Sequence, residues 1–154
     1  MCGIAGCVSY DGDLRSHKDV IAAMTETMAR RGPDAGGVWI DRHVGLGHRR
    51  LAIIDLAGGV QPMQAEEEGR ICASLIYTGE VYNFVELRDE LRQLGHRFKT
   101  RSDTEVVLRG YLQWGDKVVE RLSHNISRER RPRTVSLGRW LELALDRTLE
   151  SKRG

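Results

Sequence analysis

The sequence predicts one α+β domain followed by a basic segment of different character. Strand-like and helix-like apolar patterns follow one another without strict βαβ alternation, which favours an α+β fold over a parallel α/β fold. The 154 residues suit one domain. Hydrophobic residues make up 40% of the chain and charged residues 30%, as in ordinary globular proteins. We therefore expect a mixed domain over residues 1–122 and a separate basic tail over residues 123–154, in which Trp140, Leu143 and Leu145 indicate a last amphipathic helix.

The first elements are predicted to be a strand and a helix. Residues 4–10 form a short apolar run that ends in a turn at residues 11–13. Ser16 can cap the helix that follows, with Asp19 in a capping-box position. Gly32-Pro33 should end this helix near Arg31. Its apolar face is predicted from helical spacing to be Val20, Met24 and Met28.

The middle of the chain predicts further strands. They are expected at residues 37–41, 44–48 and 51–55, before a loop at residues 58–62. Residues 70–77 then read as a mostly buried strand.

Helices dominate the next segment. Asn83 can cap a helix that ends at Gly95. Its apolar face is predicted to be Leu87, Leu91 and Leu94. A short strand at residues 96–99 precedes a second helix, which a Ser102–Glu105 capping box opens and which runs through Trp114. Residues 116–122 complete the domain as one more short helix.

Charge and cysteine usage exclude several classes of protein. The net charge of +2 gives no general reason to expect nucleic acid or a membrane as partner. No apolar run approaches the roughly 20 residues of a membrane span, and the N-terminus is not a signal peptide. Three cysteines without CxxC spacing argue against a disulfide framework or a zinc site. They favour a reducing, cytoplasmic setting.

Cys2 is the first candidate for catalysis. It becomes the N-terminal residue once Met1 is removed, so one residue then offers a thiol and a free α-amine. A free thiol titrates at about 8.5 and the amine at about 7.7–8.0, so part of the amine is unprotonated at neutral pH. An N-terminal amine beside its own nucleophile is a known general-base arrangement. An ordinary start site with a small second residue is the alternative.

Three further segments suggest binding of a small zwitterion. Arg50, at the start of an apolar strand, can hold a carboxylate, although a solvated charge is the commoner case. Gly79 lies between a strand and a helix, where its N–H could stabilise an oxyanion, or it is simply part of a turn. Asp103 opens a helix, where a carboxylate stabilises the N-terminus; the functional alternative is recognition of an ammonium group.

Six motifs in order resemble one family. They are Met1-Cys2-Gly3-Ile4-Ala5-Gly6, Arg31-Gly32-Pro33-Asp34, the run from Gly47 to Asp55, Gln61-Pro62-Met63, Gly79-Glu80-Val81-Tyr82-Asn83 and Ser102-Asp103-Thr104-Glu105. Together they resemble the N-terminal glutaminase domain of glutamine-hydrolysing asparagine synthetases, a class II amidotransferase of the N-terminal-nucleophile type. The resemblance covers about residues 1–122.

The resemblance implies a fold and a reaction. The fold would be a four-layer αββα sandwich, incomplete at its C-terminal end. The reaction would be hydrolysis of L-glutamine to glutamate and ammonia, with the ammonia passed to a synthetase domain or chain that amidates aspartate. No metal or organic cofactor is implied for the glutaminase domain, because ATP and Mg belong to the synthetase domain. The chain contains no Ser-Gly-Gly-x-Asp-type loop, so synthetase activity is not expected in it.

The resemblance also implies individual roles. Cys2 would be the nucleophile, Thr78 and Gly79 would surround the oxyanion, and Arg50 would bind the substrate carboxylate. Glu80 and Asp103 would receive its ammonium. The wall beside the substrate would consist of Leu51, Ala52, Ile53 and Ile54.

The sequence departs from the family at two places. Thr78 stands where asparagine is usual, and losing one oxyanion donor costs about 10²–10³ in kcat. A threonine hydroxyl can replace part of that donor, so we expect impairment rather than loss. From Ser123 onward nothing resembles the family, as after a shifted reading frame or a replaced end. The strands missing there would leave sheet edges unpaired, so we expect marginal stability.

Two other interpretations remain open. The chain could be an inactive fragment that binds glutamine or a partner chain, which Thr78 and the incomplete sandwich favour. The tail could be a nucleic-acid arm, since residues 124–154 hold eight Lys or Arg against four acids. The arginine cluster at residues 128–139 is short and lacks interleaved aromatic residues, so we do not expect a nucleic-acid partner.

Overall fold

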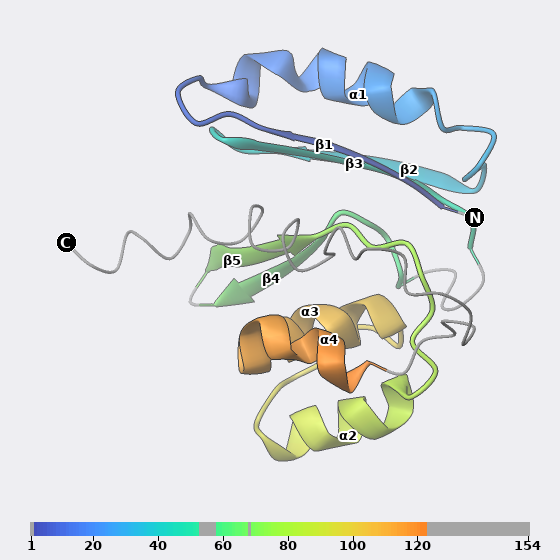
Figure 1. Ribbon diagram of the computed structural model, residues 1–154, viewed down its shortest axis with the longest axis vertical. Coiled ribbons are helices and arrows are strands. Elements are labelled where there is room, and N and C mark those ends of the chain that lie inside the picture. The colour runs from blue at the N-terminus through green and yellow to red at the C-terminus, as the bar shows by residue number, and fades with distance from the viewer. Residues whose placement is uncertain (1, 53–57, 68, 123–154) are drawn as a thin grey trace.

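Two small antiparallel sheets lie back to back, with helices on their outer sides (Figure 1). The computed structural model describes residues 2–52, 58–67 and 69–122. The first sheet has the strand order β1-β3-β2, with β1 at Gly3–Val8, β2 at Ala35–Ile40 and β3 at Val44–Arg50. The second pairs β4 (Met63–Glu67) with β5 (Arg70–Leu75). The predicted α+β class is confirmed.

The helices cover the two outer faces. Helix α1 (Lys18–Glu26) follows a 3₁₀ turn at Leu14–His17 and packs on the first sheet. Helix α2 (Phe84–Gln93) packs against α3 (Asp103–Trp114), and α3 contacts both strands of the second sheet. A 3₁₀ turn at Gly115–Lys117 leads into α4 (Val118–Arg121). Within the described residues, no helix is long and apolar enough to cross a membrane.

Helix α1 approaches β3 closely because two glycines of that strand face it. A Cβ at Gly45 would lie 2.9 Å from the Ile21 side chain, and one at Gly47 would overlap the Thr25 hydroxyl. Ile21 and Thr25 are accordingly buried. The predicted face was wrong, since Val20 is 54% exposed and Met24 41% exposed.

The predicted cap of α1 was also wrong. The helix begins at Lys18 after His17, which makes no side-chain capping bond. Ser16 lies in the preceding 3₁₀ turn, where its hydroxyl contacts His17 Nδ1 at 3.1 Å. Asp13 caps that turn, accepting a hydrogen bond from the Arg15 N–H at 3.0 Å. The capping signal therefore acts one turn earlier than expected.

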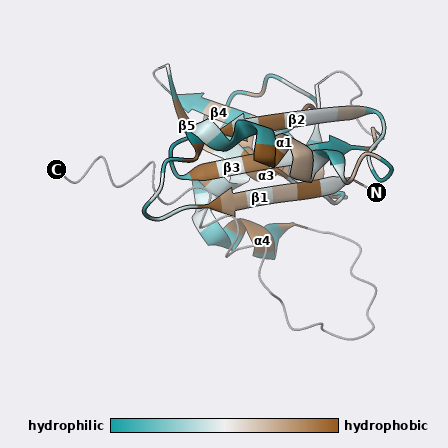
Figure 2. Ribbon diagram, turned by 90° about the horizontal axis from the view of Figure 1, so that it is seen from above, coloured by the Kyte–Doolittle hydropathy of each residue, from teal (hydrophilic) through white to brown (hydrophobic). Residues whose placement is uncertain are grey.

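The strands agree with the sequence in part. β1, β2, β3 and β5 lie near their predicted positions, and Figure 2 shows hydrophobic residues along the first sheet. In the predicted strand at 51–55, Leu51 and Ala52 belong to no strand, and residues 53–55 lie outside the described part. The predicted strand at residues 96–99 is irregular backbone, whereas β4 was missed because its sequence is mostly polar.

The main core lies between the second sheet and its helices. Its buried members are Met63, Ala65, Ala73, Leu75, Tyr77, Val81, Leu87, Leu91, Val106, Val107 and Leu108. The predicted face of α2 is confirmed at Leu87 and Leu91, but Leu94 is 50% exposed at the helix end. Gly95 follows with φ +95°, a backbone conformation that suits glycine. The predicted short helix near residue 120 is confirmed as α4.

Candidate active site

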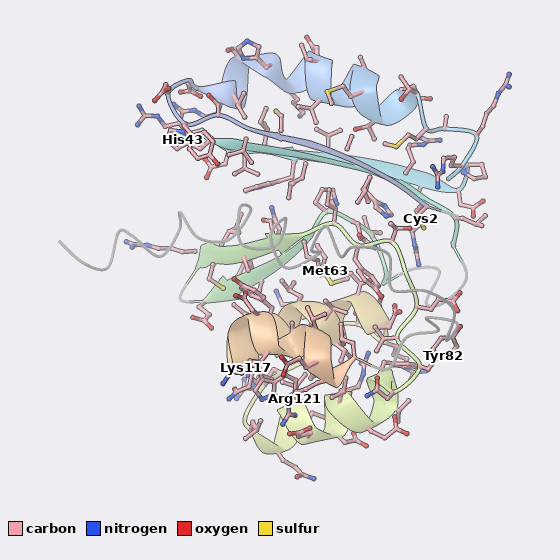
Figure 3. The ribbon with its side chains drawn as sticks, in the orientation of Figure 1. Cys2, His43, Met63, Tyr82, Lys117 and Arg121 are labelled. Carbon is pink, nitrogen blue, oxygen red and sulfur yellow. The ribbon has the colours of Figure 1, made fainter. Side chains whose placement is uncertain are left out.

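Cys2 lies at the start of β1, where the first sheet ends (Figure 3). The register pairs Gly3 with Arg49, which sets Cys2 beside the chain that leaves β3. The backbone N–H of Leu51 donates to Cys2 Sγ at 3.4 Å, and the thiol approaches the Leu51 carbonyl at 3.6 Å. The thiol is half-buried. The structure thus places Cys2 next to Leu51, one residue beyond Arg50.

The end of β3 is held by the turn before β2. The Asp34 N–H donates to the Arg50 carbonyl at 3.0 Å, and the Asp34 carboxylate accepts from the Ala52 N–H at 2.8 Å. Gly32 lies directly against the backbone of Arg49, where a Cβ would overlap it. This turn, read from the sequence as a possible plain helix stop, therefore fixes the backbone on both sides of Leu51. Arg50 itself is buried.

His48 is buried on β3, two residues before Arg50, and faces the second sheet. Burial lowers its pKa to about 4; a hydrogen bond with the Tyr77 backbone opposes this shift, and the positive charge of Arg50 adds to it. The ring is therefore neutral at physiological pH. Among the described residues, its Nε2 atom has no hydrogen-bond partner. The influence of the Tyr77 backbone on this pKa places the His48 ring of β3 near the segment that follows β5.

The candidate oxyanion loop, residues Thr78–Glu80, follows β5 and is exposed. Gly79 rests on the buried ring of Tyr77, because a Cβ there would lie 2.5 Å from the tyrosine hydroxyl. Burial raises the pKa of Tyr77 to about 12, and the negative charges of Asp103 and Glu80 reinforce the shift. The tyrosine hydroxyl therefore stays protonated among the two predicted ammonium-binding acids.

Asp103 is buried at the first position of α3, directly after the N-cap Ser102, whose side chain accepts from the Thr104 N–H as predicted. Its carboxylate accepts from the Val81 N–H at 3.1 Å and from the Thr104 N–H at 2.9 Å. Asp103 therefore stabilises the helix and also holds the end of the oxyanion loop.

The segment before Asp103 is braced from two helices. Arg88 of α2 donates to the carbonyls of Thr100 and Ser102 at 2.6 and 2.9 Å. Glu105 accepts from the N–H groups of Lys99 and Thr100 at 2.9 and 2.7 Å. Glu105, the acidic residue of the predicted capping box, thus binds backbone N–H groups of the loop that precedes α3.

The predicted site residues form two groups. Cys2, Arg50, Leu51 and Ala52 lie at the end of the first sheet. Thr78, Gly79, Glu80 and Asp103 lie where β5 gives way to α2 and α3 begins. The predicted residues Ile53 and Ile54 lie outside the described residues. Figures 1 and 3 show that the N-terminal end of β1 and the segment after β5 occupy the same end of the molecule.

Sequence reasoning missed four residues that organise these groups: Asp34, His48, Gln61 and Tyr77. Three of them occur in the quoted motifs, which was the available signal, but spacing alone does not show what a buried polar side chain contacts. In the part of the chain that the structure describes, no cluster of three or more His, Cys, Asp or Glu residues could hold a metal ion.

Comparison with known proteins gives a consistent result. A family model described as "Glutamine amidotransferase domain" matches residues 1–125. Asparagine synthetase [glutamine-hydrolyzing] 3 of Bacillus subtilis is 45% identical over 123 residues, which is 80% of this chain and 20% of that protein.

Proteins from other organisms give similar matches. A putative asparagine synthetase [glutamine-hydrolyzing] of Mycobacterium tuberculosis (strain H37Rv) is 40% identical over 137 residues, covering 79% of this chain and 21% of that protein. Asparagine synthetase [glutamine-hydrolyzing] 1 of Arabidopsis thaliana is 34% identical over 122 residues, which is 79% of this chain and 20% of that protein. The chain therefore spans about a fifth of the length of these relatives.

Proposed function

The chain belongs to the glutamine amidotransferase domain family, and from this premise we propose that it is the glutaminase half of a glutamine-hydrolysing asparagine synthetase. The observation that supports this most is the contact between Cys2 Sγ and the backbone of Leu51. It sets the proposed nucleophile next to Arg50, the proposed partner of the substrate carboxylate. At this end of the sheet, the cation can bind the α-carboxylate of an amino acid while the thiol attacks its side chain.

The proposed chemistry is acyl transfer through a thioester. After removal of Met1, the α-amine of Cys2 takes the thiol proton, and the thiolate attacks the side-chain amide carbon of L-glutamine. The α-ammonium of Cys2 returns this proton to the leaving amide nitrogen, and the tetrahedral intermediate collapses with release of ammonia, which leaves a glutamyl thioester on Cys2. Water then hydrolyses the thioester to glutamate and regenerates the thiol. No oxidant, metal or organic cofactor is needed for these steps.

The remaining predicted residues orient the substrate. Arg50 binds the α-carboxylate, and Leu51, Ala52, Ile53 and Ile54 line the substrate beside it. Glu80 and Asp103 receive the α-ammonium. The Gly79 N–H and the Thr78 hydroxyl donate to the oxyanion, where such donors act most strongly. The exposed position of residues 78–80 and the burial of Asp103 beside them support this division.

The wider context is part of the same proposal. The two sheets and their outer helices would be a four-layer αββα sandwich of the N-terminal-nucleophile type, with residues 1–122 as the glutaminase domain and residues 123–154 as an unrelated tail. The tail lies outside the described residues. The ammonia would go to ATP-dependent amidation of aspartate by a synthetase domain or chain, in the cytoplasm.

A non-enzymatic role is the second candidate. Ile4 lies on β1 two residues after Cys2, yet it is 46% exposed, and Tyr82 beside the oxyanion loop is 58% exposed. A contiguous exposed apolar patch is typical of a surface that binds a partner, and Ile4 and Tyr82 would belong to such a patch on this account. On this account the chain binds glutamine or a partner chain without turnover.

Covalent capture tests the proposed site. The probe is a glutamine analogue with an electrophilic diazoketone in place of the side-chain amide. We expect one adduct, on Cys2, that excess L-glutamine prevents and that Arg50→Met strongly slows. Peptide mapping compares Cys2 with Cys7 and Cys72, which are half-buried like Cys2 and serve as internal controls. Equal labelling of all three cysteines, unaffected by glutamine, would contradict the proposal.

A further inference from the structure

Gln61 contacts three segments that flank the candidate site, although neither the sequence nor the family match assigns it a role. The residue is buried, with 7% of its surface exposed. Oε1 accepts a hydrogen bond from the Tyr77 N–H at 2.6 Å, and Nε2 donates to Thr104 Oγ1 at 3.3 Å. Its backbone carbonyl lies directly against Gly37 of β2. One residue therefore joins the first sheet, the end of β5 and the start of α3.

We propose that Gln61 is a positioning residue that fixes the oxyanion loop relative to Cys2 and Asp103. This rests on the proposed function, because it assigns a catalytic purpose to residues 78–80. Tyr77 is the residue before that loop, so holding its N–H sets the direction in which Thr78 and Gly79 leave β5. Thr104 follows Asp103, so the other end of the same amide holds the helix terminus that binds the Val81 N–H.

His48 approaches Tyr77 from the other sheet. The Tyr77 backbone opposes the lowering of the pKa of the buried His48 ring, which places the ring near that backbone, while Gln61 accepts a hydrogen bond from the Tyr77 N–H. Neither residue belongs to the loop: His48 lies on β3, and Gln61 lies in the segment before β4. Because β3 also places Arg50 and Leu51 beside Cys2, the position of the loop is tied to the strand that carries the substrate clamp.

Gln61 contributes to stability as well as to geometry. Its hydrogen bonds contribute about 0.5–1.5 kcal/mol each, and an apolar side chain in its place would leave the buried Tyr77 N–H unsatisfied, at a cost of about 1–3 kcal/mol. A loss of stability does not by itself lower kcat in the chain that remains folded, so kcat is the quantity that distinguishes a positioning role. The two ends of the amide differ, because Oε1 accepts from the Tyr77 N–H and Nε2 donates to Thr104. The amide therefore selects one orientation of Tyr77 relative to Thr104. A small error in that orientation at a reacting centre costs about 10²-fold in rate.

The kinetic test compares four variants of the full chain. Gln61→Met keeps the volume and removes both hydrogen bonds, and we expect kcat for glutamine hydrolysis to fall about 10²-fold, with a smaller change in KM. Gln61→Glu keeps an acceptor for the Tyr77 N–H and should lie between Gln61→Met and wild type. Thr104→Val removes only the hydrogen bond from Gln61 Nε2 and should lower kcat by a smaller factor.

Thr25→Val is the matched control, because Thr25 is a buried polar residue on the opposite face of the first sheet. It should lower Tm while leaving kcat at the wild-type value. Wild-type kcat in Gln61→Met, or a rate loss that Thr25→Val reproduces at equal stability, would overturn the proposal. If Gln61→Met does not fold, Thr104→Val is judged by the same criterion.

Amide hydrogen exchange provides a readout that needs no turnover. The Val81 N–H bonds to Asp103 and not to Gln61, so its protection reports loop position rather than the deleted bond. We expect faster exchange at Val81 in Gln61→Met than in Thr25→Val. Equal exchange would contradict the proposal. Should the wild-type chain fail to hydrolyse glutamine, the proposed function fails, and Val81 exchange still decides whether Gln61 positions the loop.

Discussion

At the scale of single residues, the candidate site depends on what the buried side chains hold in place. Cys2 and Gly79 can be proposed from the sequence because the features that suggest them are local: a thiol directly after the initiator methionine, and a backbone N–H between a strand and a helix. Gln61, His48 and Tyr77 are different. Their importance lies in contacts between segments 16 or more residues apart, as in the Gln61–Tyr77 bond, and a linear pattern does not display such contacts.

Thr78 allows a direct prediction about the oxyanion. In the pattern that the sequence resembles, asparagine is usual there, and its side-chain amide is a stronger fixed donor than a rotating hydroxyl. We expect Thr78→Asn to raise kcat, towards the roughly 10²–10³-fold that one such donor contributes. Steady-state glutamate release measures this. An unchanged rate would show that Thr78 is already an adequate donor.

His48 makes the stability of the fold depend on pH. Its pKa lies at about 4 in the folded chain and at 6.5 ordinarily, so between these values only the unfolded chain binds the extra proton. The free energy of unfolding should therefore fall as pH drops from 6.5 towards 4, by up to about 3 kcal/mol, and not fall further below that. Burial causes most of the shift, and the charge of Arg50 adds to it.

Urea unfolding at about pH 7 and about pH 5 measures this slope. Other groups titrate in the same range, so the informative quantity is the difference between wild type and His48→Gln at each pH. This difference in the free energy of unfolding should become smaller as the pH falls. A difference that stays constant would mean that folding does not lower the pKa of His48.

At the scale of elements, the sequence predicts helices and buried strands better than the faces that pack. The predicted cap at Ser102 and the buried Leu87 and Leu91 are confirmed, because local hydrogen bonding and apolar spacing determine them. The face of α1 was wrong because the helix turns Ile21 and Thr25 towards the sheet, where Gly45 and Gly47 of β3 allow a close approach. β4 was missed because Met63 and Ala65 are buried in a segment that is otherwise polar.

The close contact between Gly47 of β3 and Thr25 of α1 predicts how substitutions at these two positions combine. Gly47→Ala would force a methyl group into the Thr25 hydroxyl and destabilise the fold by about 1–3 kcal/mol. Thr25→Ala removes the obstructing atoms, so the double variant should recover part of that loss. Chemical unfolding of the two single variants and the double variant tests this coupling. Strictly additive effects would show that α1 does not pack on Gly47.

At the scale of the whole molecule, the described strands leave open edges. Among them, β1 pairs with β3 alone, and β4 pairs with β5 alone. Exposed strand edges and apolar side chains favour association between chains. Ile4 combines both features, since it lies on the edge strand β1 and is 46% exposed.

We therefore expect marginal stability. The isolated chain should bind a dye specific for exposed apolar surface and should unfold over a broad, low thermal transition. Ile4→Thr should reduce dye binding, because it removes exposed apolar area from the edge. Fluorescence and calorimetry measure these properties. A cooperative transition well above room temperature, with no dye bound, would contradict the expectation.

Glutaminase activity of the purified chain tests the central claim most directly. The assay measures glutamate released from L-glutamine, with intact mass to confirm that Met1 is removed and Cys2→Ala as the control. We predict turnover that Cys2→Ala abolishes, which would mean that residues 1–122 assemble a working site. Folded, Met1-processed chain that releases no glutamate would contradict the account and leave the second candidate, a non-catalytic binding module.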